Sequence, residues 1–451
     1  MAVNLELDYQ FLKDSYTGRG GYLDGSYLIK FPNESDEKFK NRKEYSPVFN
    51  FCKKIVDSIT GHVFKRSPIR KLSKTLWYEK FINNTDRRGT YIDDKMHQLL
   101  KLTLINGVIF VIVDKPRIKV ETAQEEREAN VFPYMTFRKP TQLVDYAIDE
   151  FGNLTYIVFK EASPEDPTKS IYRKYTQNEW FIAEDEQFTN IKDHGEHKLG
   201  VVPVIPFTVT QLEDDEIFAT PFILEIARLQ KDFYNAVSEL RTILRDNTFP
   251  ILTFPIKQDS EIEPLKNQGL TLSTNNGLLY NAEAGAKPEF IAPPSDPAQI
   301  YLSYMEFLIK QIFKQVNLDF ASSRAESGLA KQYDYLEFTT MLVNFANALE
   351  ACEYKIAELV AKWTNEEVPD EFYIEYTKQF TILDTEQFAN TLLMVLDRPD
   401  LPPVLRNELM KLTARIILNP FKDEKELTQI ENAIDSEEDW EVKLRVEGWK
   451  S

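Results

Sequence analysis

The sequence has few of the residues and patterns on which several classes of protein depend. Only two cysteines occur, Cys52 and Cys352, and both fall on apolar helix faces. We therefore predict buried free thiols rather than a disulfide or a metal site. No apolar run approaches the roughly 20 residues of a membrane-spanning helix. The segment MAVNLELDYQ has no signal-peptide pattern, so we expect a protein made in the cytosol that does not enter a membrane.

Positive charge is also in the minority. Lys and Arg number 54, Asp and Glu number 72, and the formal net charge of the 451 residues is −18. A protein that coats nucleic acid would be basic, so that class is disfavoured. DNA that passes through a confined channel with weak contacts remains compatible with this charge.

Patterns that indicate catalysis are equally scarce. The phosphate-binding patterns GxxxxGK[ST] and GxGxxG are absent. His194 and His197 lie close together, but in a polar segment that predicts a solvated loop rather than a metal site. The pair Asp93 and Asp94 is interpreted as a solvated turn. We predict no catalytic residues, no metal, no cofactor and no enzymatic activity.

The patterns that are present predict a mixed α+β chain. Residues 1–46 are polar and rich in tyrosine, so we expect an extended or loosely helical arm. A helix is predicted to open at Ser46 and Pro47, and another to run from about Tyr91 to a C-cap at Asn106-Gly107. A short buried strand over 108–113 follows. An antiparallel β meander is predicted over 134–137, 143–148, 154–159, 171–175 and 179–183, and two prolines make 201–207 an edge strand or connector.

The stretch from Thr220 to Trp363 predicts two helices interrupted by a proline-rich β insert, then one longer helix. Pro221 is expected in the first turn of the first helix, where a missing N–H costs nothing. The second helix begins at Asp296 and is apolar nearly all round, so we expect it to be enclosed on several sides. The third runs from about Leu329 to Trp363 and would be roughly 50 Å long.

Two cationic features each have two interpretations. The polar break Asn317–Gln332 is a plain linker, or a loop near the axis of a ring that touches a phosphate backbone without reading sequence. The cations of the first helix are its solvated face, or they face a DNA channel. These four residues are Arg228, Lys231, Arg241 and Arg245.

The order and spacing of these parts resemble the portal proteins of tailed bacteriophages. The matching segments are FPNESDEKFKNRKEYSPVFNFCKKIVDSITGHVF, the helix–strand unit Thr90–Asp114 ending INGVIFVIVDKP, the Pro221 helix leading to NTFPILTF, and ESGLAKQYDYLEF. In that family the copies form a ring, usually of twelve, at one vertex of the capsid. Each segment is moderately specific, and their order carries the resemblance over nearly the whole chain.

The resemblance implies a portal-type α+β fold with seven parts in chain order. They are an α/β wing over 1–219, a first stem helix over 220–248, a clip over 249–296, a second stem helix over 297–317, a tunnel loop over 318–332, a long helix with a return to the wing over 333–380, and a small helical crown over 381–451.

The resemblance also implies a function and partners. The ring would form the channel for DNA packaging and ejection and a docking platform at the portal vertex of the virion, after assembly in the host cytoplasm. Its partners would be further copies of the chain, double-stranded DNA without sequence specificity, the terminase large subunit, the major capsid protein and scaffold, and a head-completion or adaptor protein.

Contact residues follow from the same resemblance. DNA would meet the tunnel loop at Ser322, Ser323, Arg324, Lys331 and Gln332, and the four cations of the first stem helix would face the channel. The motor and connector would meet the clip at Lys257, Asn275, Asn276 and Gly277.

Two alternatives stay open. One is an oligomeric virion or cytosolic scaffold that never encloses DNA. The other is a metal-dependent hydrolase built on His194 and His197.

Overall fold

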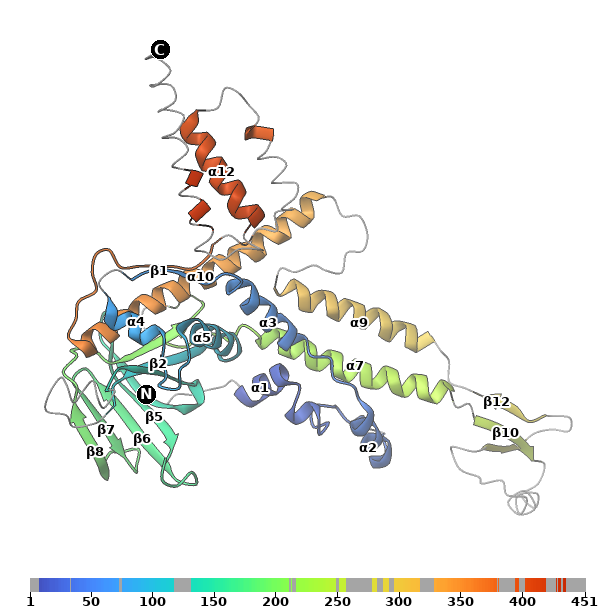
Figure 1. Cartoon of the computed structure of the whole chain (residues 1–451). Helices are drawn as coiled ribbons and strands as arrows, with labels where there is room; N and C mark the ends of the chain where they lie inside the picture. Colours follow the sequence, from blue (N-terminus) through green and yellow to red (C-terminus); the bar gives the residue numbers. More distant parts are fainter. Residues whose placement is uncertain are drawn as a thin grey trace, which may run out of the picture. The chain divides into compact units, whose positions relative to one another are not determined.

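The chain combines helices and strands throughout, which confirms an α+β fold (Figure 1). The computed structural model describes residues 8–32, 34–72, 75–116, 131–210, 212, 216–248, 251–256, 278–281, 287–291, 296–316, 328–378, 380, 394–396, 402–418, 427, 429–430 and 433–434. The chain divides into a first unit, Met1–Lys378, and a second, Gln379–Ser451. No helix in these described ranges is both long enough and apolar enough to cross a membrane.

The N-terminal arm is more regular than its polar sequence predicts. It contains α1 (Tyr9–Thr17), the short 3-10 turn η1 (Gly20–Tyr22) and α2 (Asp36–Tyr45), followed by α3 (Phe51–Val63). The prediction of a helix opening at Ser46 and Pro47 was wrong: Ser46 is the residue at which α2 ends. Helix α3 begins later because the Asn50 side chain accepts a hydrogen bond of 2.8 Å from the Lys53 N–H and caps it.

Helix α5 (Ile92–Asn106) leads into the centre of a three-stranded sheet. Gly107 ends the helix as predicted, with φ of 81°, and a Cβ there would lie 2.0 Å from the carbonyl oxygen of Ala219. The sheet has the order β3-β2-β9, from β3 (Tyr134–Arg138), β2 (Val108–Asp114) and β9 (Val204–Thr208). All of β2 is buried, and the proline-containing β9 is an edge strand of this sheet, as predicted.

A five-stranded antiparallel meander lies against that sheet. Its order is β4 (Leu143–Ile148), β5 (Leu154–Ala162), β6 (Ser170–Thr176), β7 (Glu179–Ala183) and β8 (Ile191–Glu196). Two sequence predictions change here. The strand at 134–137 pairs with β2 and not with the meander, and β8 occupies residues predicted to be a solvated loop. The core between the sheets includes Phe110, Ile157 and Phe159.

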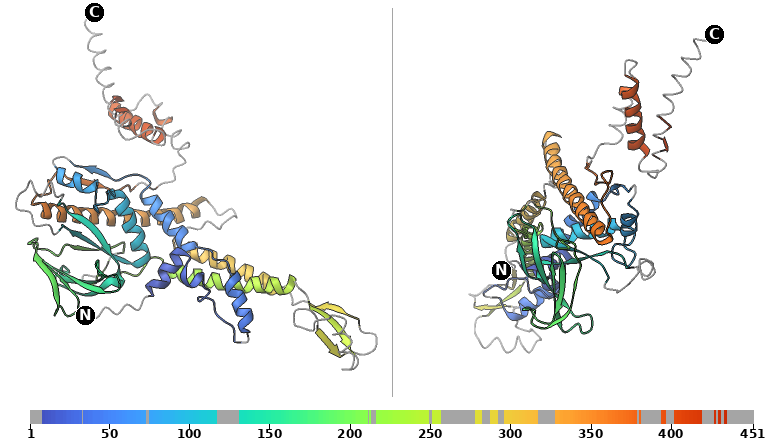
Figure 2. Two further views of the ribbon diagram at one scale, coloured as in Figure 1. Left: turned by 60° about the horizontal axis from the view of Figure 1, so that its bottom comes forward. Right: turned by 90° about the vertical axis from the view of Figure 1, so that its left-hand side faces the viewer.

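Helices α7 (Leu224–Thr248) and α9 (Asp296–Lys314) run side by side (Figures 1 and 2). Pro221 does not lie in the first turn as predicted. It precedes the helix, and its carbonyl accepts a hydrogen bond of 3.1 Å from Leu224. Between the two helices in sequence lies a three-stranded sheet in which β10 (Ile251–Ile256) pairs in parallel with β11 (Leu278–Asn281) and antiparallel with β12 (Glu289–Ile291).

Helix α10 (Gly328–Thr364) is the longest described element, in agreement with the predicted long helix. Its middle is tied to the strand pair β1 (Ile69–Lys71) and β13 (Tyr373–Glu375) and to α4 (Leu76–Ile82) by a fully buried Glu353. Arg70 contacts both carboxylate oxygens, at 2.6 and 2.9 Å, and the Tyr78 and Tyr376 hydroxyls donate at 2.9 and 2.6 Å. Four charge-assisted bonds therefore compensate the buried carboxylate.

In the second unit, α12 (Pro403–Leu418) matches the helix predicted at those residues. The helix predicted over 385–396 is described only at 394–396, where the backbone is helical. The rest of that prediction lies outside the described residues.

Candidate functional site

Helix α7 has two different faces, one toward α9 and one toward the N-terminal arm. Toward α9 the contacts are apolar, and Phe233, Ala236 and Leu308 form one buried cluster. At the edge of this contact the Tyr301 hydroxyl donates a 2.6 Å hydrogen bond to Glu239. That bond is the main cause, and burial the second, of a pKa of Tyr301 raised to about 12. The α7–α9 contact is thus a conventional hydrophobic seam with one polar edge.

The arm face of α7 combines an apolar cluster, in which Tyr234 packs against Tyr22 and Leu28, with a set of buried hydrogen bonds. The Gln230 amide accepts from the Cys52 N–H at 2.9 Å and donates to the Ser15 carbonyl at 2.9 Å. One turn later the Tyr234 hydroxyl donates to the carbonyl of Tyr22, also at 2.9 Å. These bonds specify how the arm lies on α7, because a misplaced arm would leave buried polar groups without partners.

Arg42 of α2 forms the charged part of the same contact. Its guanidinium meets Glu34 through two bonds of 2.7 and 2.8 Å, with side chains only 4% and 7% exposed. It also lies 3.4 Å from the Ser238 hydroxyl of α7. Burial alone would raise the pKa of Glu34, but the bonds from Arg42 and the Phe31 N–H outweigh it and lower that pKa.

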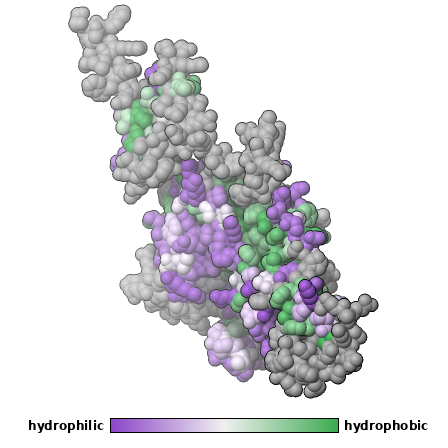
Figure 3. Space-filling model, turned by 90° about the vertical axis from the view of Figure 1, so that its right-hand side faces the viewer, coloured by the Kyte–Doolittle hydropathy of each residue, from purple (hydrophilic) through white to green (hydrophobic). Residues whose placement is uncertain are grey.

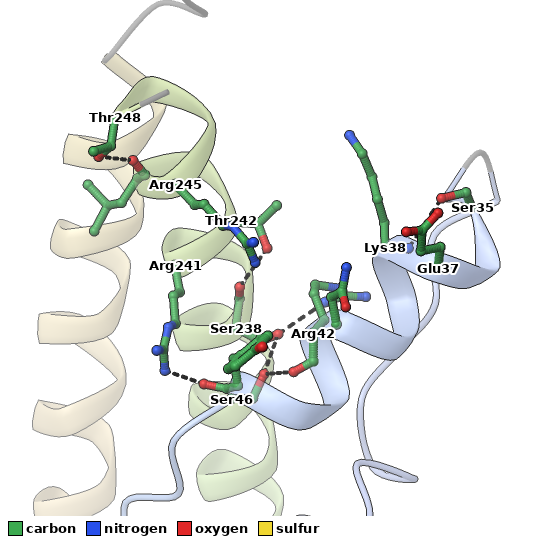
Figure 4. A pocket seen from close by; sticks show the side chains of 13 residues that line it. Ser35, Glu37, Lys38, Arg42, Ser46, Ser238, Arg241, Thr242, Arg245 and Thr248 are labelled. Carbon is green, nitrogen blue, oxygen red and sulfur yellow. Dashed lines mark hydrogen bonds between the residues drawn. The ribbon is translucent and has the colours of Figure 1, made fainter. Parts of the chain in front are cut away.

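Beside this contact lies a pocket of about 670 Å³ between α2 and the C-terminal half of α7 (Figure 4). The view shows α7 between α9 on one side and α2 on the other. The pocket walls are mostly hydroxyl, amide and charged side chains. They come from Ser35, Glu37, Lys38, Asn41, Arg42, Tyr45, Ser46, Ser238, Arg241, Thr242, Leu244, Arg245 and Thr248.

Three of the four cations that the sequence analysis considered on α7 point to the arm. Lys231 lies 5.4 Å from the ring centre of Tyr27. The Arg241 guanidinium donates to the Tyr45 carbonyl, and the Arg245 guanidinium lies 5.8 Å from the ring centre of Tyr45. They are therefore not a uniformly solvated helix face.

The fourth cation of that set, Arg228, differs from the other three in its partner. Like Arg241 and Arg245 it is exposed, but it pairs with Glu225 of its own helix at 2.6 Å. Both members of the pair lie on α7, so Arg228 is the member of the set that best fits a solvated helix surface.

Most of the remaining predicted contact residues lie outside the part of the chain that the structure describes. Ser322, Ser323, Arg324, Lys257, Asn275, Asn276 and Gly277 lie outside the described residues. Lys331 and Gln332 fall within α10, which begins at Gly328, so the predicted tunnel loop is too long at its C-terminal end. The long helix includes these residues.

The histidine pair does not assemble a metal site in the described part of the chain. His194 lies on β8 and stacks on Phe181, and His197 follows the strand with its ring 5.7 Å from that of Trp363. Burial lowers the pKa of His197. Among the described residues no group of three potential ligands is placed to hold a metal ion.

The two other simple predictions have opposite outcomes. Cys52 and Cys352 are buried free thiols, as predicted, and burial raises the pKa of each to about 12. Asp93 is not a solvated turn residue, because it opens α5 and lies 2.7 Å from the buried Arg70.

One side of α9 exposes apolar side chains, and hydrophobic surface gathers on the face seen in Figure 3. Ile300, Tyr304 and Phe307 are 68%, 44% and 52% exposed and recur at helical spacing, so they form one stripe. We call these three residues the α9 stripe. The prediction that this helix is enclosed on several sides does not hold for a single copy of the chain.

Comparison with known proteins gives weak likenesses. No protein-family model matches the chain, and no curated protein matches it. Among solved structures, a chain from the neck of a native GTA particle computed with C12 symmetry is 10% identical, with a TM-score of 0.43 over 80% of this chain and 88% of that chain. A chain from the virion of a native gene transfer agent particle is 9% identical, with a TM-score of 0.44 over 91% and 99% of the two chains. Likenesses at this level identify neither a family nor a function for this chain.

Proposed function

We propose that this chain is a subunit of a phage portal ring, with twelve copies at one vertex of the capsid. The ring encloses a channel through which double-stranded DNA enters and leaves the virion. The observation that carries the proposal is the order of the described elements: α7 and α9 packed along each other, a small sheet between them in sequence, and the long α10 after them. That order agrees with the stem, clip and long helix implied by the sequence resemblance.

The α9 stripe supports assembly into an oligomer. Ile300, Tyr304 and Phe307 form an exposed apolar surface that one copy of the chain leaves open to water. Exposed apolar patches of this kind mark interaction sites, and a neighbouring copy would remove the patch from water. In a ring, each copy contacts the next through two different surfaces, so the stripe would face another part of the neighbouring chain.

The net charge of −18 supports a passive channel. A negative interior repels the phosphate backbone, so DNA slides without becoming trapped. The few cations near the axis, with Arg324 and Lys331 as our candidates, would then make local contacts to the backbone without reading its sequence.

In this proposal the chain is not an enzyme, and chemical energy comes from a partner. The terminase large subunit would dock at the clip during filling, with contacts at Lys257 and Asn275–Gly277, and a head-completion or adaptor protein would replace it afterwards. The major capsid protein and scaffold would surround the ring during assembly in the host cytoplasm.

Imaging tests the proposal directly. We expect negative-stain electron micrographs of the purified protein to show rings of about twelve subunits with a central hole wide enough for duplex DNA. A closed oligomer without a hole would overturn the portal proposal and favour a scaffold that never encloses DNA. The variants Arg324→Glu and Lys331→Glu should still form rings but impair DNA packaging or retention. Normal packaging by both variants would remove these two residues from the proposed DNA contact.

A further inference from the structure

The pocket between α2 and α7 carries an excess of positive charge. Lys38, Arg241 and Arg245 line it together with a single carboxylate, Glu37, while the fourth cation, Arg42, is already paired with Glu34. Within the described ranges, no carboxylate forms an ion pair with Lys38, Arg241 or Arg245. Cations around a concave site form a favourable environment for an anion.

Two of these cations have donors to spare. Arg241 uses one N–H on the Tyr45 carbonyl, and Arg245 contacts the Tyr45 ring through its guanidinium. A guanidinium has five N–H donors in a planar fork that matches a carboxylate. The two side chains are four residues apart on α7 and line the same pocket, so one anionic segment can contact both (Figure 4).

The shape and remaining lining favour a peptide over duplex DNA. A duplex presents a convex, regularly charged surface, and proteins bind it with a stripe of many cations. Here the cations line a concavity, and exposed apolar atoms of Leu244 and Tyr45 lie among them. The hydroxyls of Ser35, Ser238 and Thr242 also line the pocket, and each already makes a hydrogen bond within the chain.

We propose that this pocket binds an acidic peptide segment of a different protein, with carboxylates on Arg241, Arg245 and Lys38 and an aliphatic side chain against Leu244 and Tyr45. The inference goes beyond the portal proposal and does not depend on ring formation.

A second copy of the chain is the less suitable occupant. Permanent contacts between identical subunits are more apolar than transient ones. The apolar surface suited to such a contact is the α9 stripe, whereas the pocket lies on the arm side of α7 and mixes charged side chains with apolar atoms of Leu244 and Tyr45. A pocket lined by several charged side chains suits a partner that binds and leaves.

The test uses the full-length chain and a short fluorescein-labelled peptide that alternates glutamate, leucine and glycine. Binding is measured by fluorescence anisotropy at low salt, beside the same peptide with glutamine in place of each glutamate. Arg245→Gln and Lys38→Gln should each weaken binding roughly tenfold or more, because each removes a charge-assisted contact. Arg228→Gln is the matched control, since Arg228 lies on the same helix but outside the pocket, and it should leave the affinity unchanged.

Each other outcome overturns the inference. Recognition of carboxylates here would be excluded if the glutamine peptide bound as tightly as the glutamate peptide. It would also be excluded if Arg245→Gln and Lys38→Gln bound the glutamate peptide as tightly as the unmodified protein does. If a duplex oligonucleotide displaced the labelled peptide at a lower concentration than the unlabelled peptide does, a phosphate backbone would be the occupant. A change in oligomer mass in both pocket variants, measured by light scattering, would make a second copy the occupant. A salt titration of the unmodified protein needs no variant to fold, and an affinity independent of salt would also overturn the inference.

Discussion

The two faces of α7 pack in different ways against neighbours that lie at opposite sides of the helix. Phe233 and Ala236 meet Leu308 of α9 through apolar atoms alone. Gln230, Tyr234 and Ser238 meet the N-terminal arm through hydrogen bonds and the Arg42–Glu34 pair. One helix therefore joins α9 mainly by burying apolar area, and joins the arm through hydrogen bonds together with the apolar cluster of Tyr22, Leu28 and Tyr234.

The difference teaches what each contact contributes. Apolar burial is non-directional, so the α7–α9 seam supplies stability and tolerates small shifts. Hydrogen bonds are directional and contribute little net free energy, but a wrong arrangement leaves them unmade at high cost. The hydrogen bonds of the arm face therefore fix its position, while the Tyr22, Leu28 and Tyr234 cluster adds apolar burial there, and the pocket that we propose as a peptide site is built on that face.

The largest expected effect comes from truncating the apolar face. Phe233→Ala removes a ring that is 5% exposed and packs against α9, and Phe51 also contacts it at a ring-centre distance of 5.1 Å. We expect the free energy of unfolding to fall by about 3–5 kcal/mol, from lost burial and the cavity left behind. Urea unfolding followed by tryptophan fluorescence measures this. A loss below about 1 kcal/mol would contradict a tightly packed seam.

A smaller effect is expected on the polar face. Gln230→Leu keeps the volume roughly constant but leaves the Cys52 N–H and the Ser15 carbonyl buried without partners. Each unsatisfied group costs about 1–3 kcal/mol. The same urea measurement gives the total. Amide hydrogen exchange should distinguish this face from the other: we expect faster exchange in α1 and at the start of α3, and unchanged exchange in α9. Equal acceleration in α9 would show that the two faces are not independent.

Local patterns predicted a large part of the fold. The helix ending at Gly107, the strands β4 to β7, the proline-limited edge strand β9 and the helix pair α7 and α9 all follow from periodicity and turn chemistry within each segment. The strand β8 was missed because the charged and glycine-containing run at 191–196 has no apolar alternation. It is formed by pairing with β7, with Gly195 against Trp180.

The site and the buried ion pair of α10 were harder to predict, because their residues come from distant segments. Glu353 of that ion pair is a charged residue in a mostly apolar helix, and its partner Arg70 is 283 residues away. The arm contact left one usable signal, the polar residues Gln230, Tyr234, Ser238 and Thr242 at steps of four along α7, which indicate a buried polar stripe. The sequence of α7 indicates its cations. It does not indicate their neighbours, because no local pattern shows that α2 packs beside them.

The smallest effect is expected at Arg228, which lies on α7 but serves neither face. Its only described ion pair is with Glu225, at 2.6 Å on an exposed surface. Such pairs contribute about 0–1 kcal/mol, so Arg228→Glu should change the free energy of unfolding by less than about 1 kcal/mol. The variant is therefore a clean probe of the channel hypothesis. If Arg228 faces DNA in the proposed ring, packaging should fall while stability and ring formation stay unchanged. If packaging is also unchanged, Arg228 is a solvated surface residue. A large loss of stability would show that Arg228 belongs to a further contact that a single copy does not contain.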